Sequence, residues 1–326
     1  MRRRRRRLLG RAFLKRRQLR AVVDRTPTLG PDDILAFATV RNEADRLPWF
    51  LDHHRRLGVT HFIFVDNDSD DGTGAFLSDQ PDCSVWHTSH SYKLSRFGLD
   101  WITWLMIRHG HGRWCLVLDA DELFIYPHWP TRPLSALTER LDQTGTPMMG
   151  ALMLDLYPQG PVGDTAYRPR QDPLEILTHF DAGNYSIQVQ RPMKNLWVQG
   201  GARARAFFGD EPRRAPTLQK VPLVRWHWRY VYVNSTHALL PPRLNRIYGE
   251  GETLSGVLLH TKFLDSIVKR SAEERLRQEH FANSDLYNSY YESLTQNPSL
   301  WCEASTPYRG WRALEGLGVM SRGDWV

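Results

Sequence analysis

The stretch "ILAFATVRNEADRLPWFLDHHRRLGVTHFIFVD", residues 34–66, places a strand, a helix and a second strand in immediate succession. The apolar runs 34–40 and 60–66 are short, which is typical of buried strands. Between them, apolar side chains recur at helical spacing over 41–59, and Gly58 is placed to end that helix. Two strands joined through a helix predict parallel neighbours in one sheet.

The same alternation continues as far as residue 126. A short helix is expected after the acidic loop 66–73, and a longer one over 96–112. Further strands are expected over 83–89 and 113–126. Strands and helices that alternate in this way predict an α/β fold, with a mostly parallel sheet that carries helices on both faces.

The remainder of the chain is less regular. A strand is expected over 150–158 and a helix over 271–294, whereas residues 159–220 are rich in Arg, Pro and Gly and show weak periodicity. The chain has 326 residues, of which 41% are hydrophobic and 24% charged, so its composition is that of a globular protein. This length suffices for one large domain or two modest ones.

Positive charge is concentrated at the N-terminus. Residues 1–20 hold eleven of the 43 Lys and Arg residues and none of the 36 acidic ones, which leaves 32 basic residues against 36 acidic in the body. The body therefore lacks the basic bias of a nucleic-acid platform, and nucleic acid is not the expected partner. Residues 1–33 are interpreted as a basic tail and linker. The tail is either a solvated segment, an amphipathic helix on an anionic membrane surface, or a nucleic-acid contact.

Targeting signals are not evident in the sequence. No stretch approaches the ~20 apolar residues of a membrane span, and "LLGRAFL" is too short and too interrupted for the core of a secretory signal. Cys83, Cys115 and Cys302 form no CxxC pair, so neither a zinc site nor a disulfide framework is indicated. We therefore expect a cytoplasmic protein, with peripheral contact at the inner face of the membrane as the hypothesis for the Arg-rich tail.

Polar clusters follow three of the expected strands: "RNE" at 41–43, "DNDSDD" at 66–71 and "DADE" at 119–122. Ligands bind at the carboxyl ends of parallel strands, so these clusters are expected to meet at one edge of the sheet. In an extended segment, Asp119 and Asp121 point the same way and repel each other unless a cation lies between them. A divalent cation site and a solvated acidic turn are both consistent with this pattern.

Two stretches, "ATVRNEADRLPWFLDHHRRLGVTHFIFVDNDSDDGT" and "WCLVLDADELFIYP", together resemble the glycosyltransferase family 2-like group, in particular the bacterial branch with the pattern RNE…DxSxDGT…DADE. The resemblance covers about residues 34–127 and continues faintly through "KVPLVRW" (220–226) and "LLHTKF" (258–263). It implies a GT-A fold, a UDP- or GDP-sugar donor, Mn²⁺ or Mg²⁺ at the DxD motif and inversion of the anomeric centre. Residues 34–150 would then form the nucleotide-sugar-binding half, and residues 151–326 the acceptor-side half, of one catalytic domain.

The resemblance also implies roles for individual residues. The metal would be held by Asp119, Asp121 and His260, with Asp121 as the stronger ligand, and Lys262 would neutralise phosphate. The family often has Asp where Asn67 stands, so the family pattern does not tell how this chain recognises the nucleobase. The donor is expected to contact Thr39, Arg41, Asn42, Glu43, Asp66, Asn67, Asp68, Arg96 and Asp119.

An acceptor hydroxyl needs a general base to attack the donor sugar. Asp155, at the end of the expected strand 150–158, is the candidate, and a structural turn carboxylate is the other interpretation. The expected function is transfer of a sugar to a glycan or lipid-linked acceptor in surface polysaccharide assembly. Two alternatives remain open. One is a metal-dependent phosphoester hydrolase, which usually needs a second cluster of His and Asp ligands, and the other is a non-catalytic GT-A-like binding protein.

Overall fold

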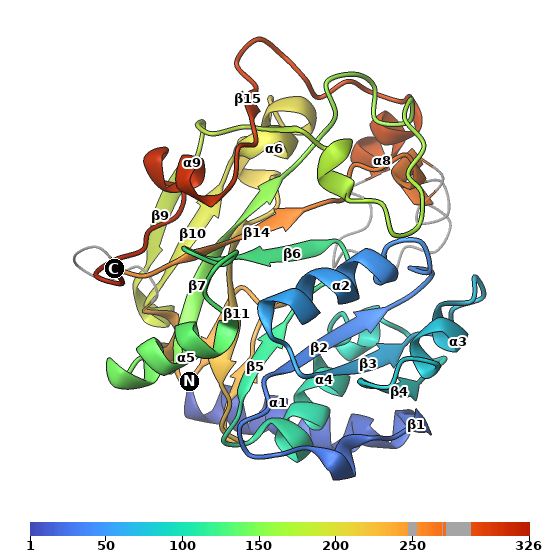
Figure 1. Cartoon of the computed structure of the whole chain (residues 1–326), viewed down its shortest axis with the longest axis vertical. Helices are drawn as coiled ribbons and strands as arrows, with labels where there is room; N and C mark the ends of the chain where they lie inside the picture. The colour runs from blue at the N-terminus through green and yellow to red at the C-terminus, as the bar shows by residue number, and fades with distance from the viewer. Residues whose placement is uncertain (247–252, 269, 272–287) are drawn as a thin grey trace.

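The structure is a computed structural model that describes residues 1–246, 253–268, 270–271 and 288–326. Its centre is a nine-stranded sheet with the strand order β1-β4-β3-β2-β5-β11-β7-β14-β6 (Figure 1). In chain order these strands are β1 (Arg20–Val23), β2 (Leu35–Val40), β3 (His61–Asp66), β4 (Cys83–His87), β5 (Trp114–Val117), β6 (Glu122–Ile125), β7 (Met148–Asp155), β11 (Gln219–Arg225) and β14 (Gly256–His260).

Six of the nine strands run in one direction. Strands β2, β3, β4 and β5 are parallel to one another, and β7 and β14 keep this direction on the far side of β11. The other three strands, β1, β6 and β11, are antiparallel to their neighbours. The predicted α/β fold, with a mostly parallel sheet flanked by helices, is therefore confirmed.

Strand β2 is buried on both faces of the sheet. Ala36 and Ala38 belong to the same apolar cluster as side chains of α2 (Leu47–Leu57) and α5 (Leu134–Gln143). Leu35 and Phe37 point to the opposite face and pack with α4 (Leu99–Leu105), which continues as a π-helical turn over Met106–Gly110. Cover on both faces explains why the first strand of the sequence is a continuous apolar run and not an alternating one.

Helix α2 begins later than the sequence predicts, at Leu47 and not near residue 41. The preceding residues bend toward the acidic loop, and Asn42 adopts φ 53°. The backbone N–H of Asn42 donates to Ser69 Oγ at 3.0 Å, and that of Glu43 donates to Thr73 Oγ1 at 2.8 Å. These bonds join the loop after β2 to the start of α3 (Thr73–Ser78). The end of α2 is as predicted, with Gly58 at φ 104°.

The stretch 113–126 forms two strands, where the sequence predicts one. Strand β5 ends at Val117 in the middle of the sheet, and β6 starts at Glu122 on its far edge, beside β14. The residues between them form a turn, in which the N–H of Glu122 donates to the carbonyl of Asp119 at 3.1 Å. The two aspartates of the DxD motif therefore lie on a turn and not on an extended strand.

The second half of the chain adds three strands to the sheet and builds a smaller layered region beside it, visible in the upper part of Figure 1. The predicted strand 150–158 is present as part of β7. Of the predicted helix 271–294, residues 272–287 lie outside the described residues, and the end is present as α8. Among the described residues, this region also contains α6 (Gly201–Phe207), α8 (Asn288–Thr295), α9 (Trp311–Gly316), and the pairs β9 (Ser186–Gln190) with β10 (Asn195–Gln199), β12 (Val231–Tyr232) with β13 (Leu239–Leu240), and β8 (His179–Phe180) with β15 (Thr306–Pro307).

The basic N-terminal segment is an ordered helix that packs on the body, which differs from the solvated segment, one of the three interpretations of the tail. Helix α1 (Arg2–Lys15) packs on α4 and buries Leu8 and Ala12. Its Arg11 donates from Nε to Asp100 Oδ2 at 3.1 Å. Strand β1 then pairs with the edge of β4. Within the described part of the chain, no helix combines the length and apolar character that crossing a membrane requires.

Candidate functional site

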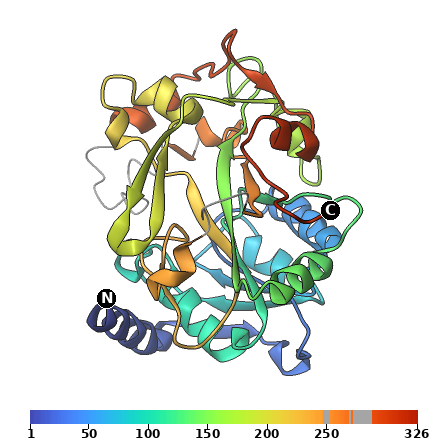
Figure 2. The ribbon, with the colours of Figure 1, turned by 90° about the vertical axis from the view of Figure 1, so that its left-hand side faces the viewer.

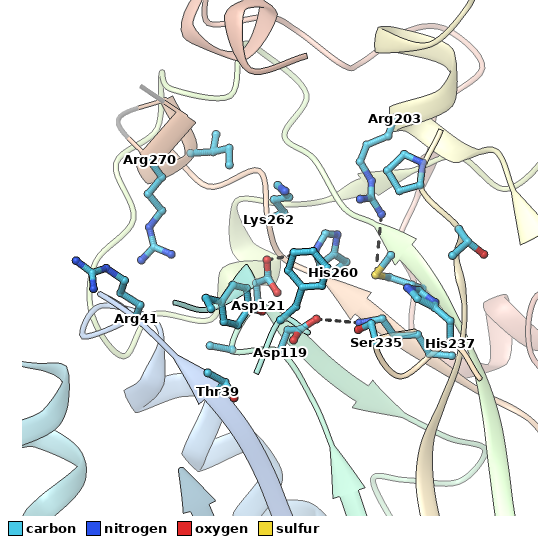
Figure 3. Close-up of a pocket in the computed structure, with 18 of the residues that line it drawn as sticks. Thr39, Arg41, Asp119, Asp121, Arg203, Ser235, His237, His260, Lys262 and Arg270 are labelled. Carbon is cyan, nitrogen blue, oxygen red and sulfur yellow. Dashed lines mark hydrogen bonds and ion pairs between the residues drawn. The ribbon is translucent and has the colours of Figure 1, made fainter. Parts of the chain in front are cut away.

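A cavity of about 710 Å³ lies at the carboxyl ends of β2 and β14 (Figure 3). Its walls include Thr39 to Glu43 after β2, the turn 119–121 after β5, and His260 and Lys262 around the end of β14. Two of the three polar clusters of the sequence thus meet at one edge of the sheet, as predicted. The third contributes Asn67. The volume is in the range of small-molecule and cofactor sites.

Asp121 and His260 face each other across the cavity floor. Asp121 Oδ2 lies 3.2 Å from His260 Nε2, and the backbone carbonyl of Asp121 accepts from the N–H of Thr261 at 2.7 Å. On the other side of the ring, His260 Nδ1 lies 2.6 Å from Asp155 Oδ1. Burial alone would lower the pKa of His260, but the two carboxylates raise it. Burial alone would raise the pKa of Asp121, but His260 and Arg46 hold it well below its usual range.

This pair fits a divalent cation site. Carboxylate oxygens and imidazole nitrogens bind such ions at about 2.0–2.2 Å, so atoms 3.2 Å apart can both bind one ion. A carboxylate behind a metal-binding histidine, as Asp155 is here, commonly orients the ring. In the described part of the chain, no group of three His, Cys, Asp or Glu side chains converges as a ready cation site. An ion held by Asp121 and His260 would therefore depend on substrate phosphates and water for most of its other ligands.

Lys220, the second residue of β11, holds the other half of the DxD turn. Its ammonium donates to Asp119 Oδ2 at 2.9 Å and makes a shorter contact with Glu122. Glu122 also accepts from the backbone N–H of Asp119 at 3.1 Å, so it closes the turn. Burial alone would lower the pKa of Lys220, but Asp119 and Glu122 raise it. Glu122 is therefore a structural residue whose charge Lys220 balances, and one oxygen of Asp119 stays committed to Lys220.

The cavity wall is strongly cationic. Among the residues that the structure describes, three acidic side chains line it, namely Glu43, Asp119 and Asp121. Each of them already lies beside a cation: Asp119 binds Lys220, Glu43 binds Arg270, and Asp121 Oδ2 lies 3.7 Å from Arg46 Nη1. The lining cations outnumber the acids, and they are Arg41, Arg46, Arg203, Arg213, Arg214, Lys220, Lys262 and Arg270. This excess of positive charge selects an anionic ligand.

Two buried cations lie close to the candidate metal pair. Arg46 Nη1 is 3.7 Å from Asp121 Oδ2, and Arg46 Nη2 donates to the carbonyl of Lys262 at 3.3 Å. Lys262 is 8% exposed, and burial together with Arg203 lowers its pKa to about 8. Burial and the nearby arginine make the charged ammonium of Lys262 less stable, and a bound anion would stabilise it.

Six of the nine predicted donor residues lie together around the cavity. Thr39, Arg41, Asn42, Glu43, Asn67 and Asp119 all line the cavity. Arg41 Nη1 donates to the carbonyl of Asn67 at 2.8 Å, which links the first two polar clusters. The hydroxyl of Thr39 is buried and has no hydrogen-bond partner within the described structure, so it is available to a ligand.

Four predicted site residues lie outside the cavity lining. Asp66 accepts from the N–H of Ser69 and closes its own loop, and Asp68 lies beside Arg41. Arg96 donates to Asp100 at 2.8 Å and to the carbonyl of Tyr232 at 2.9 Å, so these protein groups hold its guanidinium. The fourth is the predicted base.

Asp155 is buried behind His260. One of its oxygens bonds His260, and the other accepts from Arg203 Nε at 2.7 Å. Burial alone would raise the pKa of Asp155, but Arg203 and His260 lower it to about 2. A base must reach the hydroxyl that it deprotonates. Asp155 reaches only protein groups, so the geometry gives it the role of positioning His260 and offers no support for its role as base.

Several lining residues were not anticipated from the sequence. Lys220, Arg203 and Arg270 come from segments far from the DxD motif, and they reach the cavity only through the fold. His237 also lines it, and its Nδ1 donates to the carbonyl of Gln219 at 2.6 Å, which leaves Nε2 as an acceptor. Lys220 had one visible signal, since it is a charged residue at the start of an otherwise apolar run.

Comparisons with known proteins add little to this geometry. No protein-family model matches the chain, and no curated protein does either. The chain is similar to a 4-diphosphocytidyl-2C-methyl-D-erythritol synthase (16% identity, TM-score 0.27, 43% of this chain and 69% of that chain). It is similar also to a candidate glucose-1-phosphate thymidylyltransferase from Bacillus anthracis in complex with sucrose (9% identity, TM-score 0.30, covering 80% of this chain and 83% of that chain). A third similar structure is a UDP-glucose pyrophosphorylase from Acinetobacter baumannii (11% identity, TM-score 0.24, covering 43% of this chain and 64% of that chain). Scores this low leave the function to be argued from the site itself.

Proposed function

We propose that the chain is a metal-dependent glycosyltransferase that moves a sugar from a UDP- or GDP-sugar to a glycan or lipid-linked acceptor, with inversion at the anomeric carbon. The observation that carries the proposal is the pairing of Asp121 with His260 at the floor of a cavity whose wall is predominantly cationic. A nucleotide sugar supplies the ligand that such a site calls for, because its diphosphate is anionic and also binds divalent ions. The resemblance to family 2-like glycosyltransferases supports the same assignment.

Two groups of lining residues would bind two different parts of the donor. Arg46, Lys262 and Arg270 would bind the diphosphate, whereas Arg41, Asn42 and the free hydroxyl of Thr39 would bind the nucleoside. Mn²⁺ or Mg²⁺ on Asp121 and His260 would stabilise the negative charge that develops on the leaving nucleotide. The carboxylate oxygen of Asp119 that does not bind Lys220 would be a further ligand of this metal ion.

The acceptor would enter from the side of the cavity that the second half of the chain builds. Trp197 and Gln199 of β10 line that side. The amide nitrogen of Gln199 donates to the carbonyls of Arg213 and Ala215, so its side-chain oxygen would accept from a sugar hydroxyl, while the ring of Trp197 would pack on the apolar face of the pyranose.

The proposal is tested by thermal unfolding with Mn²⁺ and a nucleoside diphosphate. UDP or GDP with Mn²⁺ should raise the melting temperature, and Asp121→Ala should remove the part of the shift that depends on Mn²⁺. Asp181→Ala is the control, since this carboxylate pairs with Arg205 and does not line the cavity. A shift of the same size in the Asp121→Ala variant, or none with any nucleoside diphosphate, would contradict the proposal. A hydrolysis screen of nucleotide sugars with Mn²⁺ then identifies the donor.

The phosphoester hydrolase alternative is less well supported. It calls for a dense cluster of His and Asp ligands, whereas among the residues that the structure describes the cavity presents one carboxylate–imidazole pair. The non-catalytic alternative is separated by the same screen, because a binding protein would show the thermal shift without consuming a donor.

A further inference from the structure

The solvent face of α1 combines positive charge with exposed apolar side chains. Arg3, Arg6 and Arg7 are exposed on this face. At a helical repeat of 100° per residue, Phe13 and Leu14 follow on the same side, and they are 51% and 63% exposed. The opposite side carries Leu8 and Ala12, which are buried against the body. A helix with arginines and bulky apolar residues on its free face has the pattern of a segment that lies in a membrane interface.

Helix α1 is held firmly against the body. Arg11 binds Asp100 through Nε and Nη2, at 3.1 and 2.9 Å, and Asp100 is fully buried. Leu8 packs with Val231 and Leu240. Figure 2 shows the helix at the lower edge of the molecule, with its first turn at the periphery. The cationic face is therefore presented by the folded protein in one orientation.

Two contacts of α1 lead to the rim of the cavity. Arg11 Nη2 donates to the carbonyl of Leu94 at 2.9 Å, and Leu94 lies between Tyr92 and Phe97, which line the cavity. Leu94 is itself 69% exposed. On the other side, the strand that Leu8 contacts leads directly into Asn234 and Ser235, which also line the cavity. A surface that binds α1 therefore lies close to residues of the rim.

We propose that the free face of α1 docks the protein on an anionic lipid surface, with its arginines at the headgroup phosphates and Phe13, Leu14 and Leu94 in the apolar boundary. Charge complementarity decides the occupant, because residues 1–20 contain eleven basic residues and no acidic one. Exposed aromatic and aliphatic side chains among the arginines favour a lipid surface over a nucleic acid, whose backbone offers phosphates without an apolar layer. The docking is independent of the proposed transfer reaction.

The proposal is tested by sedimentation of the full chain with vesicles. Vesicles of phosphatidylcholine with phosphatidylglycerol should bind the protein, and vesicles of phosphatidylcholine alone should not. The triple substitution Arg3→Gln, Arg6→Gln, Arg7→Gln should weaken binding roughly 100-fold, at about fivefold per basic residue near an anionic surface. The matched control is Arg170→Gln, Arg309→Gln, Arg312→Gln, which removes the same charge from exposed positions elsewhere and should keep full binding.

Leu14→Ser separates docking from simple charge attraction. Salt screens the arginines but not an apolar contact, so this variant should lose the binding that persists at high salt in the unmodified protein. Equal binding by the triple variant and its control would overturn the proposal, as would release of the protein by duplex RNA at a matched phosphate concentration. The assay contains neither donor nor acceptor, so its failure leaves the proposed transferase function untouched.

Discussion

Asp155 accepts a hydrogen bond from Nδ1 of His260 at 2.6 Å, and this bond fixes the imidazole with Nε2 toward Asp121. Arg203 occupies the second oxygen of Asp155, so the carboxylate cannot rotate away. Asp155 and His260 are the last residues of β7 and β14, Arg203 lies in α6, and the register of β7 beside β14 brings Asp155 level with His260.

Substitution of Asp155 by Asn should weaken Mn²⁺ binding without removing the metal ligands. A lost carboxylate behind a ligating histidine typically costs 10–100-fold in metal affinity, roughly. The measurement is a Mn²⁺ titration in the presence of UDP or GDP, with nucleotide binding in the absence of metal as the second readout. Asp181→Asn, which removes another buried carboxylate with an arginine partner, serves as control. An equal loss in both variants would mean that Asp155 acts only through stability.

Lys220→Met should destabilise the fold, because it leaves the fully buried carboxylate of Glu122 without a counter-charge. Removal of one partner from a buried ion pair costs about 3–5 kcal/mol. The double variant Lys220→Met, Glu122→Gln should recover most of this loss. Urea denaturation of the single and double variants measures the coupling. Additive losses would show that the two side chains do not depend on each other.

Acid should destabilise the protein through His53 and His54. Both are buried in α2, where the Nε2 of His53 donates to the carbonyl of Phe124 at 2.9 Å and His54 Nε2 accepts from its N–H at 3.4 Å. Burial lowers the pKa of His53 from 6.5 to about 4. The unfolded chain therefore takes up this proton first, and stability is lost as the pH falls from 6.5 toward about 4.

The loss should reach up to about 1.4 kcal/mol per pH unit for each such histidine. Unfolding free energies from urea denaturation across this pH range measure the slope. The variant His53→Gln keeps a donor for Phe124 but cannot titrate, so it should show a shallower slope. An unchanged slope would assign the acid sensitivity to other groups.

Asp100→Asn should loosen α1. This carboxylate binds Arg11 and Arg96 together, and hydrogen bonds to charged groups contribute about 1.5–3 kcal/mol each. Weaker binding should open the Arg-rich helix to trypsin, with cleavage on the order of tenfold faster. Mass spectrometry of a limited digest measures the rate. Asp52→Asn, an exposed carboxylate of α2 that lies near Arg55, should cleave at the original rate. Equal rates in both variants would place the stability of α1 in its apolar contacts.

The sequence predicts the parts of this molecule that depend on local pattern. Continuous apolar runs, helical spacing and Gly58 identify β2, α2 and β3, and the polar clusters after the strands mark the edge that carries the cavity. The break between β5 and β6 escapes prediction because apolar residues flank the DxD motif on both sides. Only the pairing of β6 with β14, which lies more distant in the chain, makes the turn necessary.

The cationic wall escapes prediction for the same reason. Arg203 lies in the weakly periodic segment 159–220, Arg270 directly precedes the predicted helix 271–294, and neither belongs to a motif that sets it apart from surface arginines. Their approach to the DxD turn is a product of the tertiary fold. The role of Asp155 was likewise hidden, since the sequence places a carboxylate at a strand end but cannot show that both of its oxygens are occupied.

Strand β11 bears on how the chain is made. It lies between β5 and β7, although it is synthesised after both of them. While the nascent chain leaves the ribosome, β5 and β7 therefore wait with open edges until residues 219–225 emerge. The parallel strands β2, β3, β4 and β5 can assemble in the meantime. A fragment that stops short of residue 219 would keep those edges exposed and tend to aggregate. The sheet becomes continuous from β5 to β7 only after β11 has been synthesised.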